Sequence, residues 1–258
     1  MKVLLVCRLM SGFVSSVTRG RWRPSGSPAI HKLIEVLDHE DDVHIVFTVK
    51  NSGWTFASDW EEPRDKQIAI AGLTHPVMIL AGTAALPAWV GRWRGHVSDL
   101  RQAWRLFREV GRFRPEIVYL DRSNVLAAAL LARFTRVPVV LRVLGITPSM
   151  KQIKAGRAPS YMVLRWAYHA PFALVVCTLD GSGGTAWLTE MLRPETPRCS
   201  LLNGVDPPRD QAVRPAPAAP PDTRLRVLLL GRLEPLKRCQ EFIDALLSLT
   251  SARDRIRA

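Results

Sequence analysis

The chain has 258 residues, 47% of them hydrophobic, so it can bury the core of one large domain or two small ones. Its 36 lysine and arginine residues against 23 aspartate and glutamate residues give a net charge of +13, which favours anionic partners such as phosphorylated ligands or an acidic membrane. The four cysteines form no C-x-x-C pair, which excludes a zinc pattern and a disulfide framework, and no apolar run approaches the roughly 18 residues of a membrane-spanning helix.

Strand-like and helix-like patterns open the chain. The apolar run "KVLLVC" (2–7) is typical of a strand buried on both faces. A polar loop over 8–27 follows, and the pattern of 27–40 then predicts a helix. Ser27 can cap this helix, and Pro28 suits its first position. Further strands are expected at 43–49, 67–73 and 76–81.

The same alternation continues along the chain. A helix is expected from about residue 94. Strands that alternate with helices imply parallel pairing, so the expected fold class is α/β, with a Rossmann-like doubly wound parallel sheet. The apolar face of the helix carries Val97, Leu100, Trp104 and Phe107. Later strands are expected at 116–120, 138–145 and 172–178, with helices at 124–134 and 158–170 between them.

The composition changes after residue 206. Residues 207–223 are rich in proline and alanine and have no apolar period, which is typical of a linker with polyproline character. A second strand, turn and helix then begin with "RVLLLG" and "RLEPLKR". Because one strand and one helix cannot bury both faces of the strand, we expect a first domain at 1–206 and an incomplete start of a second Rossmann-like domain at 224–258.

Two cations stand where the second strand meets its helix. Arg232 and Lys237 follow Gly231, and the backbone N–H groups of such a turn already favour an anion. An arginine fork can hold two phosphate oxygens, and a lysine adds a mobile charge. Cations held in this way stabilise a departing nucleoside diphosphate as its negative charge grows. A solvated, basic helix start is the alternative interpretation.

This turn resembles a known motif. The segment "GRLEPLKR" (231–238) is similar to the G-R-L-x-x-x-K turn of the family-4 glycosyltransferases, retaining enzymes with two facing Rossmann-like domains in the GT-B architecture. The segment "LLNGVD" (201–206) resembles the N-G-V-D segment that closes their first domain. The two segments stand in the family's order, with the proline-rich linker between them.

The resemblance implies a function and a donor site. Such an enzyme moves a sugar from a nucleotide-diphosphate sugar to a hydroxyl acceptor with retention, in glycan or glycolipid synthesis, without a metal or another cofactor. Arg232 and Lys237 would hold the donor's diphosphate. The small-residue loop of Ser25, Gly26 and Ser27 would approach that diphosphate from the first domain.

Further residues would line the cleft or meet the acceptor. By the same resemblance, Asn203 and Gly204 would shape the loop between the domains. Polar residues that end or follow a strand are expected near the carboxyl edge of the sheet, where ligands bind in this fold. These candidates are Asp121, Arg122, Arg142 and Asp180. The alternatives are a helix cap by the neighbouring Ser123 or Asn124 and, in the glycine-rich segment 178–185, an ordinary strand-to-helix turn.

Two departures from the family pattern matter. Many members carry a histidine after the strand that corresponds to 138–145, where this chain has Arg142 and Gly145. Arg142 would replace its charge, contact the acceptor or be structural. The family's paired glutamates have no counterpart before Ala258, so the catalytic residues stay unassigned and we expect a truncated form with little transferase activity.

Two other functions come into question. One is a non-catalytic acceptor- or membrane-binding subunit that a partner chain completes. The other is a nucleotide-dependent oxidoreductase, which is disfavoured because neither strand–helix turn has the G-x-G-x-x-G spacing.

The helix after residue 94 favours a peripheral contact with an anionic membrane. A basic amphipathic surface with tryptophans can bind acidic lipid. An ordinary surface helix whose tryptophans belong to the core is the alternative. Four arginines of this helix lie in one row along its surface: Arg101, Arg105, Arg108 and Arg112. The nearby tryptophans are Trp89, Trp93 and Trp104.

Two further expectations concern partners and location. The chain has no recognisable nucleic-acid-binding motif, so we expect no nucleic-acid partner. The apolar run at the start is interrupted by Arg8 too soon for a signal peptide. We therefore expect a cytoplasmic protein, with any peripheral contact at the inner face of the membrane.

Overall fold

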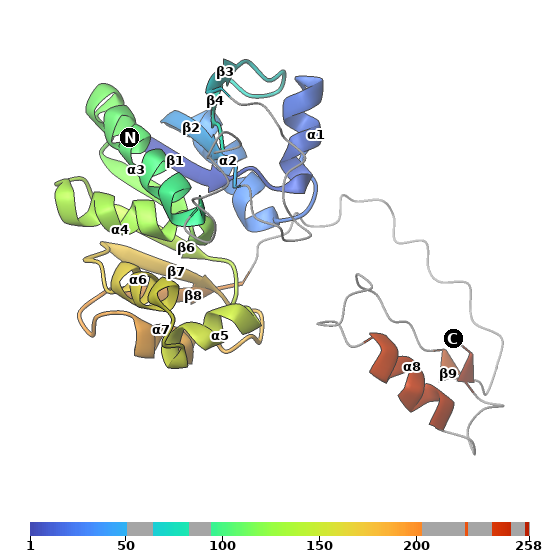
Figure 1. Ribbon diagram of the computed structural model, residues 1–258. Coiled ribbons are helices and arrows are strands. Elements are labelled where there is room, and N and C mark those ends of the chain that lie inside the picture. The colour runs from blue at the N-terminus through green and yellow to red at the C-terminus, as the bar shows by residue number, and fades with distance from the viewer. Residues whose placement is uncertain (51–63, 83–93, 203–224, 227–238, 249–255, 258) are drawn as a thin grey trace. The chain divides into compact units, whose positions relative to one another are not determined.

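Figure 1 shows the computed structural model of the chain. The structure describes residues 1–50, 64–82, 94–202, 225–226, 239–248 and 256–257. The chain divides into two compact units, Met1–Val205 and Asp206–Ala258, and each is described by itself.

An eight-stranded sheet organises the first unit. Its strands are β1 (Lys2–Arg8), β2 (Asp42–Thr48), β3 (Lys66–Ile68), β4 (Val77–Leu80), β5 (Ile117–Asp121), β6 (Val139–Val143), β7 (Leu174–Thr178) and β8 (Arg198–Leu201). They lie in the order β3-β4-β2-β1-β5-β6-β7-β8, and all neighbours are parallel except β3, which is antiparallel to β4. The parallel α/β fold expected from the sequence is confirmed.

Helices cover both faces of this sheet (Figure 1). On one face lie α1 (Ser11–Arg19) and α2 (Pro28–Glu40). On the other lie α3 (Arg94–Phe113), α4 (Val125–Phe134), α5 (Pro148–Ala155), α6 (Pro159–Tyr168) and α7 (Gly184–Met191). Because both faces are covered, the central strands are apolar along almost their whole length. A short 3₁₀ helix, η2 (Arg122–Asn124), follows β5.

The strand order reverses between β1 and β5. The chain runs from β1 outward through β2 and β4, then returns to place β5 on the other side of β1 and continues to β8. In open α/β sheets ligands bind outside the carboxyl ends of the strands at such a point. Arg8 ends β1 and Asp121 ends β5, so these two residues mark the expected ligand edge.

The polar loop expected over 8–27 is wrong in its first half, because it contains α1. Phe13 and Val17 of this helix are buried against the sheet. The helix ends at Gly20, whose φ of +62° is a left-handed conformation that suits glycine. The segment Ser11–Arg19 is rich in serine and has few apolar residues, so its apolar residues show only a weak helical periodicity. Helices α5 and α7 and strand β8 were likewise not predicted as separate elements.

The row of apolar residues expected to face the core on α3 faces outward instead. Val97, Leu100 and Trp104 are 38%, 51% and 67% exposed. Only Phe107, the fourth member of that row, packs against the core. Gln102 of the same helix is fully buried instead. The interpretation that places Trp104 in the core is therefore contradicted.

The second unit contains one β-α-β arrangement among its described residues. It consists of β9 (Leu225–Arg226), α8 (Cys239–Ser248) and β10 (Ile256–Arg257), with β10 parallel to β9. The expected helix is present from Cys239. Of the strand expected at 226–231, only Arg226 lies in β9, and the rest lies outside the described residues. Strand β10 was not predicted. The residues described for α8 include none that is buried, and its Ile243 and Leu247 are exposed.

Candidate functional site

Asp121 joins the ends of the two strands at the topological switch point. Its side chain is only 2% exposed. One carboxylate oxygen accepts the backbone N–H of Arg8 at 3.1 Å, and the other accepts Nδ2–H of Asn124 at 2.7 Å. The Asn124 side-chain oxygen in turn accepts the hydroxyl of Thr48 at 2.9 Å. The ends of β1, β2 and β5 are therefore connected through one buried polar group.

Burial is the largest influence on the pKa values of Asp121 and Arg8. Burial raises the pKa of Asp121, while its hydrogen bonds from Arg8 and Asn124 and the charges of Lys50 and Arg122 oppose the rise. Burial also lowers the pKa of the Arg8 guanidinium, and Asp121 opposes that shift. Because both oxygens of Asp121 already accept hydrogen bonds in a closed environment, the arrangement favours a positioning function for this residue.

Arg142 places a second buried charge in the sheet. It lies on β6, is 5% exposed, and donates from Nη2 to the hydroxyl of Thr178 on β7 at 3.0 Å. The parallel register aligns Arg142 with Asp121 of β5. Burial raises the pKa of Tyr119 on β5 to about 12, and the nearby Arg142 guanidinium opposes that rise.

The loops that follow β6 and β7 fit closely together. Gly145 has a φ of +121°, and a β-carbon there would overlap the carboxylate of Asp180. Asp180 accepts the backbone N–H of Ser182 at 3.0 Å, and the Ser182 hydroxyl accepts the backbone N–H of Ile146 at 2.8 Å. Asp180 itself is exposed, so a fixed carboxylate stands at this edge of the sheet.

The Ser25–Ser27 loop is held by α1. The backbone N–H of Ser25 donates to the carbonyl of Gly12 at 3.0 Å, and a β-carbon at Gly12 would overlap the Ser25 carbonyl. Gly26 and Ser27 have φ values of +65° and +43°. The expected side-chain cap from Ser27 is wrong, because its hydroxyl lies 3.2 Å from the Met10 sulfur. Its backbone carbonyl accepts the first N–H groups of α2 instead.

One cavity brings the start of α2 and Arg142 together. It has a volume of about 290 Å³ and is lined by Pro28, Ala29 and Lys32 of α2, by Arg142, and by Leu202 after β8. The amino terminus of a helix carries a partial positive charge. Arg142 adds a full charge, and Lys32 adds another that Glu35 partly balances at 3.0 Å, so the cavity is a candidate anion site. The Ser25–Ser27 loop immediately precedes Pro28, the first residue of α2 and one of those that line the cavity.

The predicted site residues differ in how far they are buried, and some lie outside the described part of the chain. Asp121 and Arg142 are buried in neighbouring strands, and Asp180 is exposed beside Gly145. Arg122 is half-buried and donates to the Thr147 hydroxyl at 3.4 Å. Four of the predicted site residues lie outside the described part of the chain: Arg232, Lys237, Asn203 and Gly204. Trp89 and Trp93 of the expected membrane surface lie outside it as well.

Sequence reasoning missed several polar groups at the same edge. Besides Arg8 and Thr48, it missed Lys50, whose Nζ lies 2.6 Å from Asp99 Oδ1 and 2.6 Å from Gln102 Oε1. Thr178, the partner of Arg142, was also missed. Each of these stands at the end of an apolar strand run or just after it, and that position was the available signal.

Two features are absent from the described residues. They hold no group of three or more histidine, cysteine, aspartate or glutamate side chains that could bind a metal ion. Within the same residues, no helix is long and apolar enough to cross a membrane.

Comparisons with solved structures give distant similarities. The chain is similar to UDP-N-acetylglucosamine 2-epimerase from Rickettsia bellii, with 11% identity, a TM-score of 0.44, and coverage of 77% of this chain and 44% of that one. A trehalose-6-phosphate structure from E. coli bound with UDP-2-fluoro glucose has 12% identity, a TM-score of 0.41, and coverage of 73% and 42%. UDP-GlcNAc 2-epimerase from Methanocaldococcus jannaschii has 12% identity, a TM-score of 0.41, and coverage of 78% and 45%.

The chain spans less than half the length of each of these structures. No family model and no curated protein matches it.

Proposed function

We propose that this chain is the acceptor-side part of a retaining glycosyltransferase that moves a sugar from a nucleotide-diphosphate sugar to a hydroxyl acceptor. The observation that carries the proposal is the gathering of cations at the ligand edge of the sheet. Arg8 and Arg122 act electrostatically on the buried Asp121, and Arg142 lies beside it in register. An anionic donor is the ligand that such an edge favours.

Two groups of residues are the candidates for binding the donor diphosphate. Arg232 and Lys237, which stand in the G-R-L-x-x-x-K segment, would bind its oxygens and stabilise the charge that grows on the leaving group. Within the first unit, the candidates are the Ser25–Gly26 loop and the amino terminus of α2. The proposal requires no metal, because these cations and helix dipoles supply the positive charge.

The acceptor would meet the exposed groups of the same edge. Asp180 is exposed and fixed by Ser182, so it can accept a hydrogen bond from a hydroxyl. Arg122 lies half-buried on the neighbouring loop. Asn203 and Gly204 would shape the passage to the second unit. The proposal includes a peripheral contact with an anionic membrane, which would bring the enzyme to a lipid-linked acceptor in glycan or glycolipid synthesis.

A phosphorus NMR titration of the purified chain tests the diphosphate site. Two charge-assisted contacts are worth about 1.5–3 kcal/mol each, which corresponds to a Kd on the order of 1 mM. We expect UDP, GDP and ADP to bind with this weak affinity in the presence of EDTA, because the cations contact the phosphates rather than the base. Arg232→Ala and Lys237→Ala should each weaken binding about tenfold.

Arg112→Ala is the matched control. Arg112 is an exposed cation on α3 that pairs with Glu109 at 3.3 Å, so its loss changes the net charge but leaves the proposed site intact. If no nucleoside diphosphate binds, or if the Arg232 and Lys237 variants bind like the Arg112 control, the proposed donor site is wrong.

A further inference from the structure

Helix α3 turns apolar side chains outward. Val97, Leu100 and Trp104 form a row of exposed residues one helical turn apart. Polar residues of the same helix face the sheet instead. Gln102 donates from Nε2 to the Val49 carbonyl at 2.8 Å. The orientation of α3 is therefore fixed by specific partners, and the outward apolar row follows from it.

A second pair of buried groups supports the same orientation. Glu109 is buried, and its carboxylate lies 3.4 Å from the His44 ring of β2. Rotating α3 to bury Trp104 would remove Glu109 and Gln102 from their partners. Each unpaired buried polar group costs about 1–3 kcal/mol, and the same rotation would expose Leu106 and Val110, which are buried against the core. The exposed apolar row is thus a stable property of the fold.

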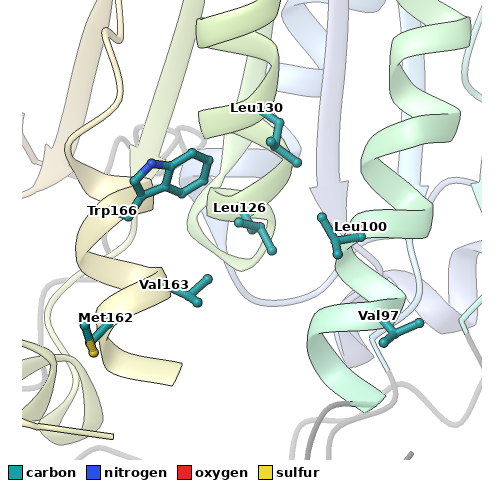
Figure 2. A pocket seen from close by; sticks show the side chains of 7 residues that line it. All are labelled: Val97, Leu100, Leu126, Leu130, Met162, Val163 and Trp166. Carbon is teal, nitrogen blue, oxygen red and sulfur yellow. The ribbon is translucent and has the colours of Figure 1, made fainter. Parts of the chain in front are cut away.

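The apolar row continues across two further helices. Figure 2 shows a groove whose side chains come from α3, α4 and α6, with α4 between the other two. Its volume is about 630 Å³. The lining includes Val97 and Leu100 of α3, Leu126 and Leu130 of α4, and Met162 and Trp166 of α6. Met162 and Trp166 are exposed like the residues of α3. Together these helices form one apolar surface, the α3–α6 face.

Trp166 is held in place on this face. The guanidinium of Arg133 lies 3.9 Å from the centre of its ring, and Nη2 of Arg133 donates to the Trp166 carbonyl at 2.7 Å. The ring is therefore ordered at the edge of the groove although it is partly exposed. A tryptophan with an apolar body and a polar N–H suits the boundary between hydrocarbon and water.

Positive charge surrounds the α3–α6 face. Residues 94–169 contain fourteen arginine and lysine residues against four aspartate and glutamate residues. Two of the four acids, Glu109 and Asp121, are buried, and of the cations Arg142 is buried as well. Between 97 and 113 the exposed residues of α3 are apolar, basic or glycine, and none is acidic: Val97, Leu100, Arg101, Trp104, Arg108, Gly111 and Arg112. On α5 and the turn after it, Lys151, Lys154 and Arg157 are also exposed.

We propose that the α3–α6 face docks on a lipid bilayer that carries anionic headgroups. The exposed apolar row would enter the headgroup boundary, the groove would take acyl-chain carbons, and the surrounding cations would meet lipid phosphates. Charge complementarity selects this partner, because the cations are interleaved with the apolar residues and exposed acids are absent from the described part of α3. The inference deepens the membrane contact of the proposed function and needs no nucleotide sugar.

Sedimentation of the full chain with vesicles tests the docking. Vesicles of phosphatidylcholine alone are compared with a mixture of phosphatidylcholine and phosphatidylglycerol. We expect binding only to the mixture, weakened at high salt because ions screen the headgroup charge. Trp104→Ala and Met162→Gln, on two different helices, should each lower the partition coefficient about tenfold. Trp104→Phe should retain most of the binding, because it keeps the aromatic side chain.

Charge variants separate a local contact from general attraction. Arg101→Glu should lower binding at least about fivefold, since each cation near an acidic surface contributes about that factor. Arg19→Glu changes the net charge equally but lies at the end of α1, on the other face of the sheet, so it should bind nearly as the wild type does. Equal losses in the two charge variants would overturn the proposal.

Three other outcomes would also overturn it. The first is a wild type that binds neither kind of vesicle, or both equally. The second is unchanged binding by Trp104→Ala and Met162→Gln. The third is concentration-dependent self-association in sedimentation velocity that Trp104→Ala abolishes, which would make the face an interface between copies of this chain. Failure of the donor site is a separate result, because Arg232→Ala should retain vesicle binding.

Discussion

Replacing Gly12 by alanine tests the contact that holds the Ser25–Ser27 loop. Gly12 lies in the first turn of α1, and a β-carbon there would overlap the carbonyl oxygen of Ser25. Because the neighbouring atom belongs to the backbone, the overlap is relieved only if α1 and the loop move apart. That movement breaks the 3.0 Å hydrogen bond from the Ser25 N–H to the Gly12 carbonyl.

The free energy of unfolding should fall measurably. Overpacking a close contact costs about 1–3 kcal/mol, and the broken hydrogen bond costs about 1 kcal/mol more. Alanine is favoured over glycine inside a helix by about 0.5–1 kcal/mol, which offsets part of the loss. The net expectation for Gly12→Ala is a destabilisation of about 1–3 kcal/mol.

Gly111→Ala provides the matched control. Gly111 also lies inside a helix, but a β-carbon there meets no atom within 4 Å, so this variant should gain about 0.5–1 kcal/mol. Urea unfolding followed by far-UV circular dichroism compares both variants with the wild type. The midpoint should fall for Gly12→Ala and rise for Gly111→Ala. Equal midpoints for the two variants would refute the reasoning, because α1 and the loop would then not be in contact.

Two predictions concern the pH dependence of stability. Burial raises the pKa of Asp121, so the folded chain holds this proton more tightly, and stability is lost as the pH rises from about 4 through the raised value. Urea unfolding across this pH range should show no such loss of stability in Asp121→Asn. If the wild type and this variant lose stability equally with pH, Asp121 is not the group responsible. Burial lowers the pKa of His44 although Glu109 opposes it, so stability is complete above about pH 6.5 and is lost as the pH falls below that value. His44→Gln should flatten the same profile, and an unchanged slope would mean that another group causes it.

The sequence predicts the sheet better than the helices that cover it. Apolar runs such as 2–7 and 43–49 mark β1 and β2 because both faces of these strands are buried. Helix α3 was found but placed with the wrong side inward. Periodicity treats Gln102 as a surface residue, and only the fold reveals that it bonds the Val49 carbonyl, 53 positions earlier in the chain.

The candidate site was predictable in position and less so in detail. Asp121 and Arg142 stand at or near strand ends, and that position indicates the ligand edge. Their hydrogen-bonding partners depend on which strands are neighbours in the sheet. Local sequence patterns do not determine the strand order. The bond from Arg8 to Asp121 spans 113 positions. No spacing rule within one element could have identified it.

The strand order also determines how far apart in the sequence the paired residues of neighbouring strands lie. Leu4 of β1 pairs with His44, 40 positions on, and with Val118, 114 positions on. Closing the longer loop costs about 0.9 kcal/mol more in chain entropy. The other parallel neighbours join residues within 40 positions of each other, so each half of the sheet can assemble from a continuous stretch of chain. We expect the two halves to meet late in folding, and the bond between Arg8 and Asp121 can form only at that final encounter.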